Sequence, residues 1–241
     1  MRTTPMPSML DIMATNVAKR NASVRLYERA TVYHPLENSP LADEDVWLVL
    51  GEYGGGADFF QLKGCVEAIL KDVRVDDVIF VAESGEAAFH PGRCARITSG
   101  GETIGVIGQV HPTVCATYGL DNMSFYAQLN VPKMQAHQGP ERVFTALPRF
   151  PAVSRAIALV CSDDIPVAAL VDTITAAGKP YLEEVKLFDV YKGAPIPAGS
   201  KSVAFALTLR AADQTLTEEH TTETMNAILA ALSSQHGAAI R

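Results

Sequence analysis

The fold of the last third of the chain is decided by Phe188-Asp189-Val190-Tyr191-Lys192-Gly193, followed by Lys201-Ser202-Val203-Ala204-Phe205. Both runs have the apolar and aromatic content of strands, and a loop rich in Gly and Pro separates them. Side chains alternate along a strand, so Asp189 and Tyr191 share one face while Phe188 and Val190 share the other. The second face is apolar and fits a core. The first offers an aromatic plane beside a hydrogen-bonding acid, a combination that stacks and reads an unpaired base. In the plainer alternative, Tyr191 only covers the sheet and Asp189 begins a turn.

Around these two strands the pattern predicts the order β-α-β-β-α-β. Thr217 is a suitable N-cap for the second helix, with Glu218 and Glu219 well placed in its first turn. This order is that of the ferredoxin-like split βαβ fold. The predicted strands are 154–161, 182–191, 202–210 and 238–241, and the predicted helices are 166–177 and 217–235.

The first part of the chain has its own pattern, which predicts a mixed, mostly antiparallel sheet with helices packed against it. Asp58 is expected to cap a helix that buries residues at helical spacing, Leu62, Val66 and Leu70 among them. The turn at 54–56 is glycine-rich and lacks the pattern of a phosphate-binding loop. The other predicted helices are 6–20 and one beginning near Pro112, and the predicted strands are 24–33, 47–50, 78–81, 94–98, 103–110 and 124–129.

Between these two parts, the hydrophobic pattern that is typical of helices and strands is absent. Residues 133–140 are polar and end in adjacent Gly and Pro, which is typical of a loop. We therefore predict a first domain over 1–132, a linker over 133–146 and a second domain over 147–241.

Composition limits the kind of function. The chain has 241 residues and a formal net charge of −7. Residues 147–241 hold eight Lys and Arg against ten Asp and Glu, so a nucleic-acid contact there must be local and led by shape. No apolar run reaches the length of a membrane span, and the start does not read as a secretory signal. Four scattered cysteines favour a reducing, cytosolic setting.

Several motifs carry a resemblance to one family. The stretch 149–155, the run 188–193, the strand 201–205, Thr215-Leu216-Thr217-Glu218-Glu219 and the closing Arg241 resemble the ferredoxin-fold anticodon-binding domain of the bacterial phenylalanyl-tRNA synthetase β subunit. Residues 1–7, 58–64, 90–93 and 107–112 resemble, in the expected order, the later part of that subunit's catalytic-like core domain. The resemblance extends over essentially the whole chain.

This resemblance implies a C-terminal portion of a β subunit, made of a partial class II synthetase-like domain and an anticodon-binding domain. It implies a cytoplasmic α2β2 ligase in which the α subunit holds the active site. ATP and magnesium then belong to the holoenzyme, and this portion alone is expected to be inactive, with no catalytic residue and no bound cofactor. The implied partners are the α subunit and the phenylalanine tRNA. The implied site residues are Asp189, Tyr191 and Ser202, which face the first anticodon base.

Two positions depart from the family pattern. Ala156 stands where the family usually has an acid, and Ala206 where it often has an arginine. Strand parity puts both on the outward face of neighbouring strands, so the usual pair is interpreted as a cross-strand salt bridge that is missing here. We expect folding to survive this loss, since an exposed pair contributes only about 0–1 kcal/mol, and anticodon binding to be weaker or less selective.

Two other classes of function stay open at this stage. One is a free-standing interaction module descended from the β subunit. The other is a small α+β metalloenzyme that uses the pairs His90 with Cys94 and His111 with Cys115 as a Cys₂His₂ zinc site. Against zinc, each histidine opens a His-Pro that the family carries for structural reasons, so we predict no metal site.

Overall fold

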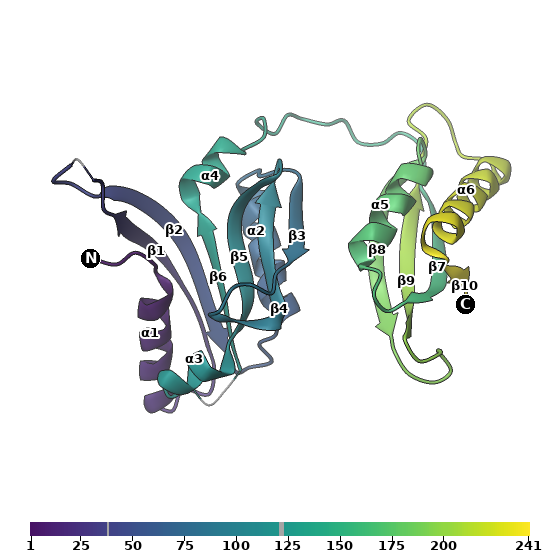
Figure 1. Ribbon diagram of the computed structural model, residues 1–241. Coiled ribbons are helices and arrows are strands. Elements are labelled where there is room, and N and C mark those ends of the chain that lie inside the picture. The colour runs from purple at the N-terminus through teal and green to yellow at the C-terminus, as the bar shows by residue number, and fades with distance from the viewer. Residues whose placement is uncertain (38, 121–122) are drawn as a thin grey trace. The chain divides into compact units, whose positions relative to one another are not determined.

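The computed structural model describes residues 1–37, 39–120 and 123–241 (Figure 1). The chain divides into two compact units, Met1–Arg142 and Val143–Arg241. No helix among the described residues is long and apolar enough to cross a membrane.

The first unit is built on one antiparallel sheet with the strand order β1-β2-β6-β5-β4-β3. Its predicted elements are confirmed, although several strands are longer than the sequence suggested. The strands are β1 (Val24–His34), β2 (Asp43–Tyr53), β3 (Val78–Ala82), β4 (Phe89–Ser99), β5 (Glu102–Val110) and β6 (Ser124–Asn130), and the helices are α1 (Met6–Ala18), α2 (Phe59–Asp72), α3 (Pro112–Thr117) and α4 (Val131–Ala136).

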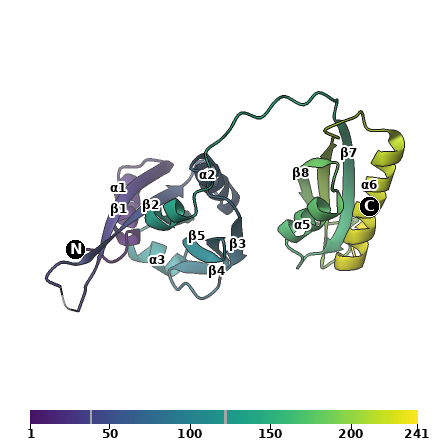
Figure 2. The same cartoon turned by 90° about the horizontal axis from the view of Figure 1, so that it is seen from above.

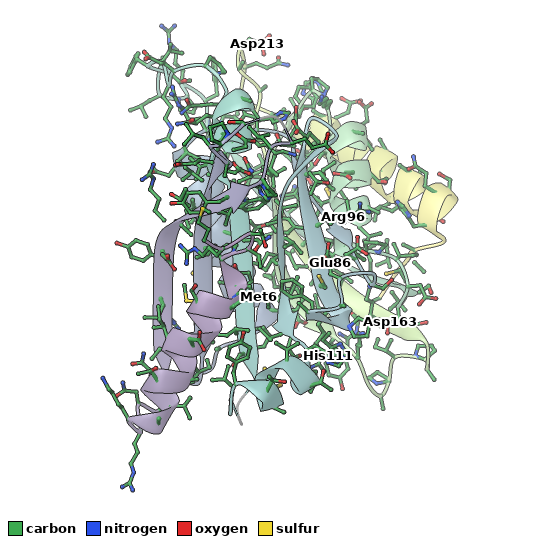
Figure 3. The ribbon with its side chains drawn as sticks, turned by 60° about the vertical axis from the view of Figure 1, so that its left-hand side comes forward. Met6, Glu86, Arg96, His111, Asp163 and Asp213 are labelled. Atoms are coloured by element: carbon green, nitrogen blue, oxygen red, sulfur yellow. The ribbon has the colours of Figure 1, made fainter. Side chains whose placement is uncertain are left out.

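Helices cover both faces of this sheet. On one face α1 and α3 pack against Tyr53 and Tyr126, and the buried α1 side chains include Met9 and Met13. Gly51 of β2 lets α1 approach closely, because a Cβ there would lie 2.8 Å from the Cγ of Met9. Figure 1 shows α1 and α2 on opposite sides of the sheet, and Figure 3 labels Met6 at the start of α1.

The opposite face is covered by α2 and α4, whose apolar side chains pack on β5 and β6. The start of α2 follows the sequence prediction, since the Asp58 carboxylate accepts a hydrogen bond from the Gln61 N–H at 2.7 Å. That bond satisfies one of the free N–H groups of the first turn. The helix then buries Leu62, Val66 and Leu70.

The predicted start of the linker at residue 133 is wrong. Residues 131–136 form α4, whose first turn is capped by the Asn130 side chain accepting from the Lys133 N–H at 2.9 Å. Met134 is buried in the core of the first unit. Further along, the Gly139 N–H donates to the Arg74 carbonyl at 2.6 Å. The polar composition suggested a loop, but the Asn130 cap and the burial of Met134 stabilise this segment as a helix on the sheet.

The second unit has the ferredoxin-like order that the sequence predicts. Its strands are β7 (Val153–Ser162), β8 (Leu182–Tyr191), β9 (Ser200–Leu209) and β10 (Ala239–Ile240), and its helices are α5 (Val167–Ala177) and α6 (Glu218–His236). The sheet order is β10-β7-β9-β8, with all three pairings antiparallel. Thr217 caps α6 as predicted, and Gly237 ends the helix at a φ of 59°, a conformation that favours glycine.

Both helices of this unit pack on one face of its sheet. Leu170 and Ile174 of α5 and Ile228 and Leu232 of α6 meet Phe205 of β9 in a single core. Figure 2 shows the two helices from above, beside the strands that they cover. Within residues 143–241, all of which the structure describes, no helix packs on the other face of the sheet.

One prediction for β8 is corrected by the structure. Phe188 and Val190 were expected in the core, but they are 58% and 44% exposed. A β-bulge between Leu187 and Asp189 makes Phe188 the extra residue. In addition, β8 is an edge strand, and the β8 side chains that pack against the core of the two helices are Leu182 and Val185, in the first half of the strand. The apolar face of the second half of β8 is therefore uncovered.

A candidate nucleic-acid interface

The helix-free face of the second sheet is lined mainly by small side chains. Along β9, Val203, Phe205 and Leu207 enter the core, so Ser202, Ala204 and Ala206 lie on the opposite face. Along β7 the same alternation puts Ala156 and Ala158 on that face. On β8 the direct partners of Ala206, Ala204 and Ser202 are Lys186, Asp189 and Tyr191. We call this surface the outward face, defined by Ala156, Ala158, Lys186, Asp189, Tyr191, Ser202, Ala204 and Ala206.

The three residues predicted for the site lie together on the outward face. Tyr191 of β8 is the Cα partner of Ser202 of β9, and Asp189 is the partner of Ala204. Directly opposed side chains on a sheet have Cβ atoms about 4.5–5.5 Å apart. The fold thus places the residues that carry an aromatic ring, a hydroxyl and a carboxylate next to one another on two neighbouring strands.

These residues differ in exposure. Tyr191 is 40% exposed, whereas Ser202 is 2% exposed although no helix covers it. The Tyr191 hydroxyl donates a hydrogen bond to the Ala194 carbonyl at 2.8 Å, which orients the ring toward the loop after β8. The Ser202 hydroxyl is consequently not accessible to a large ligand in this state of the chain.

Arg241 belongs to the same surface and was not among the predicted site residues. Its guanidinium carbon lies 5.9 Å from the centroid of the Tyr191 ring, within the range of a cation–π contact. Its backbone N–H donates to the Ala158 carbonyl at 2.9 Å. The signal in the sequence was the ferredoxin-like strand order, which puts the last strand beside the first and so brings residue 241 to the outward face.

A lysine–aspartate cluster anchors the end of β8 and the start of β9. The Lys192 ammonium donates to the Asp163 carboxylate at 2.8 Å, and this hydrogen bond holds the pKa of Asp163 below its ordinary value. Lys201 is 7% exposed and donates to the carbonyls of Asp163 and Ile165 at 2.8 and 2.6 Å. Asp163 is labelled in Figure 3. The lysine next to Ser202 therefore fixes the loop after β7.

The two positions that depart from the family pattern are neighbours, as predicted. Ala156 of β7 and Ala206 of β9 are direct Cα partners on the outward face. Neither alanine can form an ion pair, and the charged side chain next to this place is that of Lys186, the exposed Cα partner of Ala206 on β8.

In the first unit, the histidines and the arginine of the motifs make local contacts. The His111 ring caps α3 by accepting from the Thr113 N–H at 3.2 Å. Arg93 donates to the Gln109 side chain at 2.6 Å, and the His90 ring accepts from the Gly92 N–H at 3.1 Å.

The cysteines of the zinc alternative are buried. Burial raises the pKa of Cys94 to about 11 and also raises the pKa of Cys115. Over the described ranges of the chain, no three or more His, Cys, Asp or Glu side chains gather as metal ligands.

Comparison with known families assigns both units. Residues 148–241 match the ferredoxin-fold anticodon-binding domain, so the second unit is a domain of that class. Residues 1–131 match the CLM domain of the phenylalanyl tRNA synthetase beta chain, and the chain belongs to this family.

Curated relatives match along the full length of the chain. The phenylalanine–tRNA ligase beta subunits of Clostridium tetani and Clostridium acetobutylicum are 36% and 35% identical over 242 residues. Each match takes in 100% of this chain and 30% of the relative, so the chain spans about a third of the length of these relatives.

Among solved structures, the pyrrolysyl-tRNA synthetase of Desulfitobacterium hafniense is similar to 56% of this chain and 48% of its own, at 12% identity and a TM-score of 0.47. This similarity is too low to assign a fold.

Proposed function

We propose that this chain is the C-terminal part of the β subunit of a phenylalanine–tRNA ligase and that its outward face binds the anticodon of the phenylalanine tRNA. The observation that carries the proposal is the pairing of Tyr191 with Ser202, with Asp189 two residues away on the same face of the sheet. The matches to an anticodon-binding domain and to ligase beta subunits support it.

The chemistry of this surface suits one unpaired guanine, the first anticodon base. The base stacks on the Tyr191 ring, and the Asp189 carboxylate accepts hydrogen bonds from its Watson–Crick edge. Ser202 supplies a further polar contact once it is uncovered. Stacking of a base on an aromatic side chain contributes about 1–3 kcal/mol. The small side chains of Ala204 and Ala206 leave room for the base to lie against the sheet.

The net charge of the chain indicates that the anticodon is bound through short-range contacts. The chain has a formal net charge of −7, so long-range attraction to phosphates is weak. Binding is therefore led by stacking and by base-edge contacts, and its salt dependence is expected to be shallow compared with that of a basic RNA-binding surface.

The proposal for the first unit is a supporting role. We infer that it is a class II synthetase-like domain without a catalytic centre, which packs against the α subunit of a cytoplasmic α2β2 enzyme. In that enzyme ATP and magnesium are used at the active site of the α subunit. Arg93 and His111, already engaged in local hydrogen bonds, serve the structure of this unit.

Binding of labelled phenylalanine tRNA to the 241-residue chain, across a salt series, tests the proposal. Asp189→Ala and Tyr191→Ala are expected to weaken binding, while two matched controls, Asp213→Ala and Tyr27→Ala, leave it unchanged. Asp213 is an exposed acid of the second unit, labelled in Figure 3, and Tyr27 is an 80% exposed tyrosine of the first. Equal binding by all four variants, or no binding by the folded chain, would contradict the proposal.

A further inference from the structure

Arg241 and Tyr191 lie at opposite edges of the second sheet, and their side chains approach each other over its outward face. Tyr191 comes from the edge strand β8, and Arg241 directly follows β10, the strand at the other edge. For the guanidinium to lie over the Tyr191 ring, both side chains must extend across β7 and β9. The strands between them contribute small residues, such as Ala158 and Ala204, which permit this crossing.

We propose that the Arg241 guanidinium covers the base site in the free chain and becomes the second stacking plane when a base is bound. This inference rests on the proposed function and adds a residue that determines how the base is held. The bound base then lies between the Tyr191 ring on one side and the planar guanidinium on the other. Arginine suits this position because its cation is planar and weakly hydrated.

The distances fit a short outward movement of Arg241. The guanidinium carbon is 5.9 Å from the ring centroid, whereas two stacking contacts of about 3.5 Å each require about 7 Å. Admitting a base between the two groups thus requires the guanidinium to move outward by at least about 1 Å. Its backbone stays in place through the hydrogen bond from the Arg241 N–H to the Ala158 carbonyl.

The contacts of the two side chains decide which one moves. Tyr191 is held by the hydrogen bond of its hydroxyl to the Ala194 carbonyl. Within the described part of the chain, the Arg241 guanidinium has no hydrogen-bond or salt-bridge partner, and the Tyr191 ring is its recorded contact. A guanidinium carries five N–H donors. Because those of Arg241 have no partner among the described residues, they are available to a ligand.

The burial of Ser202 supports the same arrangement. Ser202 is 2% exposed on a face without a helix, so side chains of the outward face must shield it. A base that reaches its hydroxyl has to displace that cover, and between the two aromatic-site side chains the Arg241 guanidinium is freer to move than Tyr191, whose hydroxyl is hydrogen-bonded to Ala194. In the free chain, the Arg241 side chain therefore occupies the space that the bound base takes.

A thermodynamic cycle between protein and RNA tests the inference. The full chain is titrated with the anticodon stem-loop of phenylalanine tRNA, and with the same stem-loop lacking its first anticodon base. Arg241→Ala should weaken binding of the intact stem-loop about five- to tenfold and should not change binding of the abasic one. Contacting groups are non-additive in such a cycle, whereas independent groups are additive.

Two further variants separate stacking from simple attraction to phosphate. Arg241→Lys keeps the charge and loses the plane, so it should bind as weakly as Arg241→Ala. Arg29→Ala removes an equal charge from an exposed position of the first unit and should bind normally. Full recovery of binding by Arg241→Lys, or an equal loss with both stem-loops, would overturn the inference.

The proposed function is tested separately in the same titration. If Tyr191→Ala weakens binding and Arg241→Ala does not, the anticodon site stands and the role of Arg241 is refuted. If the unaltered chain binds neither stem-loop, both proposals fail. Urea unfolding of each variant checks that lost binding does not reflect a lost fold, and the midpoints are expected to match.

Discussion

Ala156 of β7 and Ala206 of β9 stand directly opposite each other on the outward face of the second sheet. The resemblance to the family leads us to expect an acid at the first position and often an arginine at the second, whereas this chain has two methyl groups. Because the two alanines are direct partners, we interpret the two departures together, as the absence of one expected cross-strand ion pair from the surface that we propose binds RNA.

Restoring both charges is expected to tighten tRNA binding. Ala156→Asp combined with Ala206→Arg rebuilds an exposed pair that is worth about 0–1 kcal/mol to stability, so the urea midpoint should change little. The gain in binding comes from an arginine placed beside Asp189 and the base, and it is measured by titration with phenylalanine tRNA.

The two single variants are the controls for this prediction. Ala206→Arg alone leaves an unpaired cation, and Ala156→Asp alone leaves an unpaired anion that repels phosphates. If the double variant binds tRNA no better than the unaltered chain, the missing pair does not explain any weakness of binding.

Asp58 is expected to contribute to the stability of the first unit through its cap on α2. Asp58→Ala removes the acceptor of the hydrogen bond from the Gln61 N–H and should lower the free energy of unfolding by about 0.5–2 kcal/mol. Asp58→Ser retains a capping oxygen and should lose much less. Urea denaturation of both variants measures the difference, and equal losses would show that the cap is not the cause.

The Asp163 cluster predicts a dependence of stability on pH. The hydrogen bond from Lys192 is the largest cause that lowers the pKa of Asp163 from its ordinary value of 3.8. A carboxyl with a lowered pKa in the folded state contributes its full stabilisation above its unfolded pKa. Between the two pKa values the unfolded chain binds more protons than the folded one, so the free energy of unfolding falls as the pH falls. This stabilisation is lost as the pH falls from about 3.8 through the lowered pKa.

Asp163→Asn removes this titration. The variant should lose less stability than the unaltered chain as the pH drops through that window, and the two unfolding curves are compared at pH 7 and at pH 3. Asp213→Asn, a change at an exposed acid of the same unit, is the matched control. Parallel pH profiles for the unaltered chain and Asp163→Asn would contradict the role of this cluster.

Local sequence patterns predicted most of the helices and strands, because helix capping and strand alternation depend on residues that are close together in the sequence. Capping by Asp58 and Thr217 needs only the next three residues, and both caps are present. The alternation along β9 needs only a strand period of two, and it correctly separates Ser202 from the core residues Val203 and Phe205.

Predictions from local sequence pattern were wrong where the position of a segment in the tertiary structure determined its burial or its secondary structure. Phe188 and Val190 look like core residues, but β8 lies at the sheet edge beyond the reach of the helices, and a bulge alters its pairing. Residues 131–136 look like a loop, but Met134 finds a place in the core of the first unit and the segment becomes α4.

The sequence by itself determined the order of strands and helices in the second unit and the shared face of Asp189 and Tyr191, because strand alternation is a property of the local backbone. Only the tertiary structure decided that Arg241 meets Tyr191 and that Ser202 is covered. Those relations depend on the lateral order β10-β7-β9-β8, which brings residues 50 positions apart in the chain into contact through hydrogen bonds between strands.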